Sequence, residues 1–129
     1  MDMSHLKFDF ITPAHPLYAG ECQLRWERLR KPLGHPPGTE KFEFEDRAVH
    51  LVATDGDGVC VGCVLFIAQG DRTGRLFQMA VSAHFEGHGL GRLLVRKLEQ
   101  HLIALGIEHI VLHARCHVQG FYERLGYVP

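Results

Sequence analysis

The stretch RLFQMAVSAHFEGHGLGRLLV, residues 75 to 95, decides the fold of this 129-residue chain. Its first seven residues form an apolar run typical of a strand, and its last leucines predict a helix. Three glycines, Gly87, Gly89 and Gly91, lie at the junction. Each of them costs stability, because glycine loses more backbone entropy on folding than any other residue. Because glycine has no side chain to cover the backbone, we expect the backbone N–H groups at this junction to be accessible to a ligand.

The helix expected after these glycines covers residues 90–105. Its leucines recur at spacings of one, three and four residues, which place them on one helical face, and Gly106 is expected to end it. The N–H groups of the glycine turn and the positive end of the helix dipole then point into one concavity. Such a place binds phosphate or pyrophosphate. A glycine-rich turn with no ligand is the alternative that this spacing leaves open.

Two other phosphate-binding patterns do not fit. A nicotinamide dinucleotide fold carries its glycines after the first strand of a parallel sheet, whereas here they follow an antiparallel meander. A Walker loop requires Gly-Lys-Ser/Thr, and this chain has Gly91-Arg92-Leu93.

The other elements follow in an order typical of a mixed α/β or α+β fold. Strands are expected over 7–12, 48–54, 59–69, 75–81 and 107–114, the last of them buried. Helices are expected over 17–30, 90–105 and a short stretch that ends at Gly126. Asp-Gly residues at 55–58 and a turn at 70–74 join three strands into a meander. The loop at 31–40, with three prolines and two glycines, is either a substrate-facing lid or an ordinary connection.

The composition is that of a soluble globular protein, with 46% hydrophobic residues, 22% charged residues and a formal net charge of −1. No basic excess points to nucleic acid. No apolar run approaches the roughly 20 residues that cross a bilayer. The N-terminus carries Asp2 and lacks the apolar core of a signal peptide. We expect a cytoplasmic protein with no nucleic acid and no membrane among its partners.

The cysteines and histidines raise the question of a metal site. Cys60 and Cys63 lie three residues apart on an expected strand, which directs them to opposite faces unless the strand is bulged at Gly62. We interpret them as small buried hydrophobes. Histidines recur every four residues at 109, 113 and 117, but the segment is expected to change from strand to loop to helix, which breaks their common face. No metal is predicted.

The sequence FYERLGY, residues 121–127, supplies the second of two motifs. The first is Met79-Ala80-Val81 followed by the glycines at 89 and 91. Together they resemble the GNAT superfamily of acyl-CoA-dependent N-acetyltransferases. In that family Arg/Gln-x-x-Gly-x-Gly/Ala follows a strand with the letters MAV, and Ala-x-x-Phe-Tyr-x-x-x-Gly-Tyr/Phe comes later. The later motif is matched by Phe121, Tyr122, Gly126 and Tyr127. The resemblance covers residues 48–129 well and the N-terminal part loosely.

The resemblance implies an α+β fold, with a central mixed, mostly antiparallel sheet whose splayed strands are flanked by helices. Residues 1–129 would form a single N-acetyltransferase-like domain. Family members normally continue with another strand beyond the position of Pro129. We expect that strand to be missing, which exposes a sheet edge, or to be supplied by a neighbour, as in a homodimer.

The resemblance also implies an enzyme that transfers the acetyl group of acetyl-CoA directly to a primary amine through a tetrahedral intermediate. The amine would belong to a small molecule or a protein, and no metal would take part. Tyr122 is the expected catalytic acid, which gives a proton to the departing thiolate; a core tyrosine with a wet hydroxyl is its alternative. The expected acetyl-CoA-binding residues are Met79, Ala80, Val81, Gly87, His88, Gly89, Leu90, Gly91, Arg92 and Phe121.

The general base stays open among Glu43, Glu45 and His113. An alkylamine with a pKa of about 10.4 is mostly protonated near neutral pH, so a base or a water chain should remove its proton. The acidic stretch 40–46, which also holds Glu40 and Asp46, would suit a cationic acceptor.

Three positions depart from the family pattern. Glu86 replaces the usual Arg or Gln before the glycines and adds a negative charge near the phosphates. Val118 replaces a small residue, and Arg115 replaces the usual Asn. Glu86 and the absence of the usual strand after Pro129 keep a second function open, that of a catalytically inactive CoA-binding sensor or interaction module with the same fold.

Overall fold

The computed structural model describes residues 2–114 and 116–129, without the side chains of residues 116 and 117. Five strands form one sheet in the order β1-β2-β3-β4-β5. The pairs among β1 to β4 are antiparallel, and β4 pairs with β5 in parallel. The expected mixed, mostly antiparallel sheet is confirmed. Its strands are β1 Lys7–Ile11, β2 Val49–Thr54, β3 Cys60–Gly70, β4 Thr73–Val81 and β5 His109–Val111.

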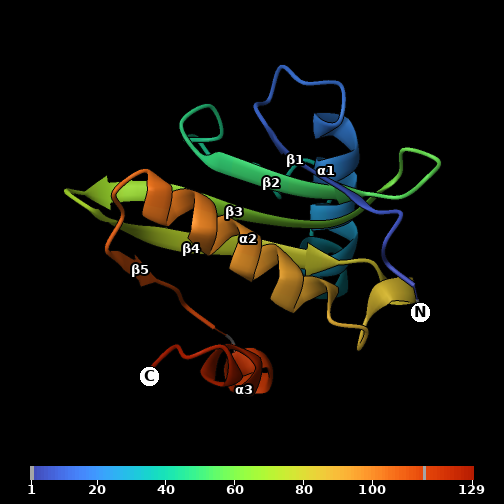
Figure 1. The fold of residues 1–129 in the computed structure, drawn as a ribbon. Helices are drawn as coiled ribbons and strands as arrows, with labels where there is room; N and C mark the ends of the chain where they lie inside the picture. The colour runs from blue at the N-terminus through green and yellow to red at the C-terminus, as the bar shows by residue number, and fades with distance from the viewer. Residues whose placement is uncertain (1, 115) are drawn as a thin grey trace.

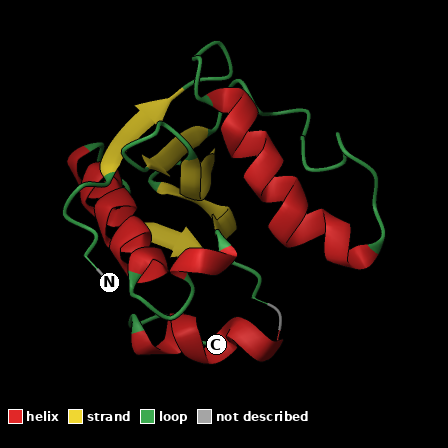
Figure 2. Ribbon diagram, turned by 90° about the vertical axis from the view of Figure 1, so that its right-hand side faces the viewer, coloured by secondary structure: helices red, strands yellow, loops and turns green. Residues whose placement is uncertain are grey.

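Helices cover both faces of this sheet (Figures 1 and 2). The first, α1, spans Tyr18–Arg25 and runs on into a π-helix, η1 (Trp26–Arg30), and a 3₁₀ turn, η2 (Lys31–Leu33). After β4 come a short 3₁₀ turn, η3 (Ala83–Phe85), and the long helix α2 (Leu90–Ala104). The last helix, α3 (Cys116–Arg124), lies below the strands in both views. The expected helices are therefore present, within a few residues of their predicted ends.

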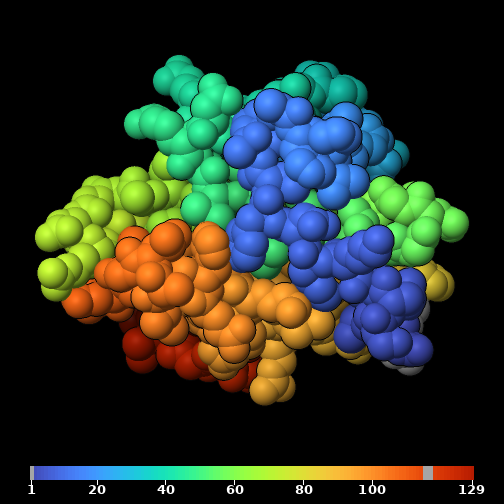
Figure 3. All heavy atoms as spheres, turned by 45° about the horizontal axis from the view of Figure 1, so that its top comes forward, coloured from blue at the N-terminus to red at the C-terminus, as the bar shows by residue number. Residues whose placement is uncertain are grey.

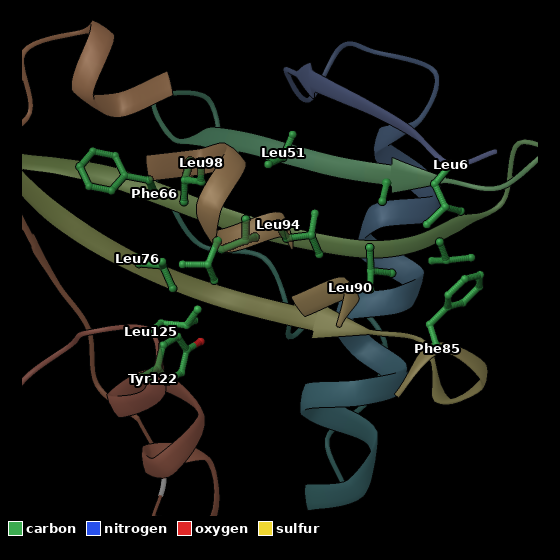
Figure 4. Packing of buried hydrophobic residues seen from close by; sticks show 14 of the residues in the cluster. Leu6, Leu51, Phe66, Leu76, Phe85, Leu90, Leu94, Leu98, Tyr122 and Leu125 are labelled. Carbon is green, nitrogen blue, oxygen red and sulfur yellow. The ribbon is translucent and has the colours of Figure 1, made fainter. Parts of the chain in front are cut away.

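The leucine face of α2 forms the larger part of the core. Leu90, Leu94 and Leu98 are fully buried and point at sheet residues that include Leu51 and Phe66 (Figure 4). The N-terminal segment, in blue, lies against α2, in orange, in the space-filling view (Figure 3). This packing holds the N-terminus of α2, and with it the glycine turn, in place at the end of β4.

The opposite face of the sheet packs against α1 and carries both cysteines of β3. Thr54 pairs with Cys60 but Ala53 pairs with Gly62, so β3 holds one extra residue at this point. The resulting bulge turns Cys60 and Cys63 to the same face, so the expectation of opposite faces is wrong. Both thiols are buried, and burial raises the pKa of Cys60 to about 12. They pack as neutral hydrophobes, as the sequence predicted.

A second bulge, in β4, opens the sheet. Leu65 pairs with Phe77 and Cys63 with Ala80, so Gln78 and Met79 together face a single β3 residue. Gln78 has a φ of 52°, a strained value for a residue other than glycine. Strain of this kind concentrates at functional sites.

β4 and β5 diverge before this bulge is reached. They pair only over Thr73–Arg75 and His109–Val111. The expected strand over 107–114 is therefore shorter than predicted, and its ends, His109 and Val111, are exposed instead of buried. The splay leaves one edge of β4, from residue 76 to 81, without a strand partner in the described chain. A strand from a second copy beside β5 stays a prediction.

In the part of the chain that the structure describes, no helix combines the length and apolar character needed to cross a membrane.

Candidate active site

The glycine turn presents its backbone donors as the sequence predicted. Gly87 and Gly89 have φ values of 75° and 88°, a region that side chains make costly. Helix α2 starts after Gly89 without a side-chain cap. The N–H groups from Gly89 to Arg92 find no acceptor among the described residues. Four open donors at the positive end of a helix dipole form a surface suited to a phosphate.

This turn forms one end of a cavity of about 630 Å³. All the predicted cofactor-binding residues except His88 line it, and the N–H of His88 donates to the carbonyl of Phe85 at 3.3 Å. A Cβ on Gly91 would lie 3.3 Å from Phe121 Cζ and 3.5 Å from Met79 Sδ, so the wall closes tightly around this glycine. Arg28, Leu29 and Arg124 also line the cavity, and sequence analysis did not foresee them.

Glu86, the acidic departure from the family pattern, forms an ion pair with Arg28. Arg28 comes from η1 and lines the same cavity as Glu86. The guanidinium offsets the negative charge that Glu86 brings beside the glycine turn. Sequence analysis missed this pair because its members are 58 positions apart in the chain, which hides their proximity.

A second cavity of about 400 Å³ adjoins the first and shares Arg28, Leu29, Met79 and Val118 with it. Its wall also contains Gln78 at the β4 bulge, Tyr122 of α3, and side chains from η1, from the loop after η2 and from the end of β5. The strained part of β4 thus lies where the two cavities meet. We call the first the cofactor cavity and the second the acceptor cavity, after the roles that we propose for them below.

Tyr122 is 7% exposed, and its hydroxyl points toward β4 (Figure 4). Burial raises its pKa to about 12, so the phenol keeps its proton well above neutral pH. The ring packs edge-on against Phe121, with the ring centroids 4.9 Å apart. Tyr122 is therefore a core residue that also lines the acceptor cavity, and its catalytic role stays a prediction.

Tyr122 also borders a hollow of about 660 Å³ on its other side, between β5 and residues 126–129. None of the glycine-turn residues lines that hollow.

Glu45 is bound too firmly to act as a base. Its carboxylate accepts hydrogen bonds from Arg25 at 2.8 and 2.9 Å, from Tyr18 Oη at 2.6 Å and from the Phe42 N–H at 3.0 Å. Burial alone would raise the pKa of Glu45, but these bonds outweigh it and hold the pKa at about 2. Of the other candidate bases, exposed Glu43 lines neither cavity, whereas His113 lines the acceptor cavity.

Arg25 is the centre of a buried polar network that the sequence analysis did not predict. Its guanidinium is fully buried and lies 2.7 Å from Glu21 Oε2. Glu21 in turn lies 2.9 Å from His50 Nδ1. Arg25 Nε donates to Gln78 Oε1 at 3.4 Å. The i,i+4 spacing of Glu21 and Arg25 was the available signal, but such pairs usually lie on exposed helix faces.

This network also explains a cluster that could otherwise suggest a metal. Ligand atoms of Glu21, Glu45 and His50 lie within 4.8 Å of one another. Arg25 already supplies the positive charge between the two carboxylates. Of the histidines considered from the sequence, His109 and His113 are exposed, and the side chain of His117 lies outside the described residues.

The comparison with known proteins agrees with this geometry. The model of the acetyltransferase (GNAT) family matches residues 18–127, and the chain belongs to that family. A relative, glucosamine 6-phosphate N-acetyltransferase 1 from Oryza sativa subsp. japonica, is 32% identical over 109 residues, which cover 72% of this chain and 66% of that protein. The match covers smaller shares of two other curated relatives, 37% and 30% of their lengths.

Solved structures share the fold. A putative N-acetyltransferase from Lactobacillus plantarum superposes with a TM-score of 0.83 at 21% identity, over 95% of this chain and 84% of that one. A putative acetyltransferase from Deinococcus radiodurans R1 has a TM-score of 0.76 at 25% identity, over 100% of this chain and 86% of that one. The predicted GNAT-like α+β fold is confirmed.

Proposed function

We propose that this chain transfers the acetyl group of acetyl-CoA directly to a primary amine. The observation that carries the proposal is the junction of two cavities at the β4 bulge. One cavity ends in open helix N–H donors, and the other is lined by Tyr122. A phosphate-bearing acyl donor in the first would bring its reactive end to an amine in the second.

The residues of the cofactor cavity fit acetyl-CoA, which supplies the activated acetyl thioester. The N–H groups from Gly89 to Arg92 would hold the pyrophosphate, with Arg92 as a charge partner. The unpaired edge of β4 would hydrogen-bond the pantetheine amides as an added strand does. Apolar side chains along this path, among them Met79 and Phe121, would cover the linear arm.

The chain's own groups would then act at three points. A β4 N–H near Met79, freed by the bulge, would stabilise negative charge on the thioester oxygen. Tyr122 would donate its proton to the departing thiolate. His113 would take the proton of the attacking amine, because it is the candidate base that lines the acceptor cavity. No covalent intermediate on the protein is required.

The acceptor would be a small molecule. A cavity of about 400 Å³ lies within the size range of metabolite sites. The similarity to a protein named for acetylation of glucosamine 6-phosphate favours a small-molecule amine over a protein amine. Glu86 was one of two reasons for the alternative of a catalytically inactive CoA sensor, and its pairing with Arg28 weakens that one reason.

A thermal-shift titration tests the cofactor part of the proposal. Acetyl-CoA at about 100 times its Kd should add about 2.7 kcal/mol to the free energy of unfolding, which is several degrees in Tm. NAD and ATP serve as controls and should shift the Tm less. Gly91→Val, which pushes a branched side chain toward Phe121 and Met79, should abolish the acetyl-CoA shift. An equal shift with all three ligands, or none with millimolar acetyl-CoA, would contradict the proposal.

A further inference from the structure

The acceptor cavity is lined by basic side chains, and none of the described residues in its wall is acidic. The basic members are Arg28, Arg30, Arg75 and His113. Arg28 has a carboxylate partner in Glu86. Within the described residues, no carboxylate lies within ion-pair distance of Arg30 or Arg75. Two guanidinium charges therefore face one hollow without a counter-ion from the chain.

Both arginines also have an unused buried donor. The Nε atom of Arg30 and that of Arg75 are buried and find no hydrogen-bond partner in the part of the chain that the structure describes. Buried polar atoms in folded proteins are nearly always paired, and like charges in a shared cavity repel. An oxyanion brought by a ligand would satisfy both requirements.

The position of these arginines separates them from the phosphates of acetyl-CoA. Arg75 precedes the β4 bulge, whereas the glycine turn follows Val81 at the other end of the strand. The six residue steps of strand from Arg75 to Val81 span about 20 Å. Arg92 and Arg124 line the cofactor cavity, so cationic side chains are already present there. The anion that Arg30 and Arg75 would bind belongs to the other substrate.

The structure also removes the sequence argument for a cationic acceptor. Glu45 is turned into the buried network around Arg25, and Glu40 is 3% exposed, with its carboxylate accepting from the Gly38 N–H at 2.9 Å. Neither glutamate lines the acceptor cavity. Glu40 and Glu45 of the acidic stretch 40–46 therefore make buried structural contacts and add no negative charge to the wall of this cavity.

We infer that the acceptor is a small primary amine that also carries a carboxylate or a phosphate, and that Arg30 and Arg75 bind this anionic group. The inference rests on the proposed acetyl transfer in this cavity. Guanidinium groups suit the task because their planar fork binds either oxyanion through two parallel hydrogen bonds. Arg30 of η1 and Arg75 of β4 line the same cavity, and the amine would react near Met79, which lines both cavities.

Matched acceptor pairs test the inference. O-phosphoethanolamine is compared with ethanolamine, and glycine with glycinamide, with rates expressed per concentration of unprotonated amine. Putrescine is the cationic control. We expect one or both anionic members to exceed their neutral partner in kcat/KM by about 10- to 100-fold. The pair with the larger ratio distinguishes phosphate from carboxylate recognition. Equal or better rates with neutral or cationic amines would overturn the inference but not the proposed activity.

Arg30→Gln and Arg75→Gln connect the preference to these two residues. Each should lower kcat/KM for the preferred anionic acceptor by at least about tenfold and leave the KM for acetyl-CoA unchanged. Arg72→Gln, at an exposed arginine outside both cavities, is the matched control and should match the parent. A uniform loss with every acceptor in the two cavity variants would contradict anion binding.

A binding measurement keeps the inference testable without turnover. Calorimetry of O-phosphoethanolamine and of glycine against protein saturated with CoA should show binding of the preferred anion, which Arg75→Gln abolishes. Binding of this kind without acetylation of any amine would overturn the proposed activity and support the anion site. Absence of both binding and turnover would overturn both.

Discussion

Replacement of Arg25 by Met should destabilise the protein by about 3–5 kcal/mol, because it leaves two carboxylates buried without their partner. Glu21 is 0% exposed and Glu45 is 8% exposed, so water cannot replace the guanidinium. The pKa of Glu45, which Arg25 lowers together with Tyr18 and the Phe42 N–H, gives a magnitude of the same order. It falls from 4.5 to about 2 in the folded protein, and each pKa unit corresponds to about 1.4 kcal/mol, which gives about 3 kcal/mol.

The pH dependence of this loss follows from the sign of the shift. A carboxyl group with a lowered folded pKa stabilises the protein above its unfolded value of 4.5, and this contribution disappears as the pH falls toward 2. In Arg25→Met the buried carboxylates would instead take up protons on mild acidification. The gap between variant and parent should therefore be largest near pH 7 and should shrink by at least about 1 kcal/mol at pH 5.

Urea unfolding followed by circular dichroism and by the fluorescence of Trp26 measures both effects. Arg72→Met is the matched control, because it breaks an exposed arginine–glutamate pair at 3.2 Å and should cost at most about 1 kcal/mol. The double variant Arg25→Met/Glu45→Gln should recover part of the loss. Equal losses at the two arginines, or an Arg25 loss independent of pH, would refute the reasoning.

Other consequences are tested with single variants. Tyr122→Phe should lower kcat by about 10²- to 10⁴-fold in steady-state assays and leave the Kd for acetyl-CoA unchanged; an equal rise in Kd would point to a packing role alone. Because the pKa of Tyr122 is raised to about 12, kcat should show no loss from tyrosine ionisation between pH 8 and about 10.5, and a fall with a midpoint near 10 would contradict the assignment. Gly74→Ala places a Cβ 2.2 Å from Phe66 Cζ and 2.4 Å from a β3 carbonyl, so it should destabilise by about 2 kcal/mol or more in urea, whereas Gly56→Ala, with nothing within 4 Å, should stay within about 0.5 kcal/mol.

The features that the sequence predicted well are those with a local physical cause. The leucine spacing of residues 90–105 and the Asp-Gly turn at 55–58 determine their own backbone, and both elements are observed. The two motifs at a large separation identified the fold, because their joint occurrence is far more specific than either glycine turn or tyrosine alone. The lining of the cofactor cavity could then be predicted, because residues of both motifs form its wall.

The features that the sequence missed depend on the pairing of distant segments. Gln78 is not a turn residue, so nothing in the local sequence reveals its left-handed φ or the splay of β5. The bulge in β3 turned both cysteines to one face for the same reason. Glu45 was a reasonable base from composition, but only the fold shows that Arg25 holds it. The basic wall of the acceptor cavity combines η1 with β4, which are distant in the chain.

The most direct test of the central claim is the product balance of acetyl transfer. Purified protein, acetyl-CoA and a panel of anionic, neutral and cationic primary amines are incubated together, and free CoA thiol and N-acetylated amine are both quantified. The account predicts equal amounts of the two products with at least one amine, and a rate that falls by about 10²-fold or more in Tyr122→Phe. Bound acetyl-CoA with no amine-dependent thiol release from any member of the panel would contradict it.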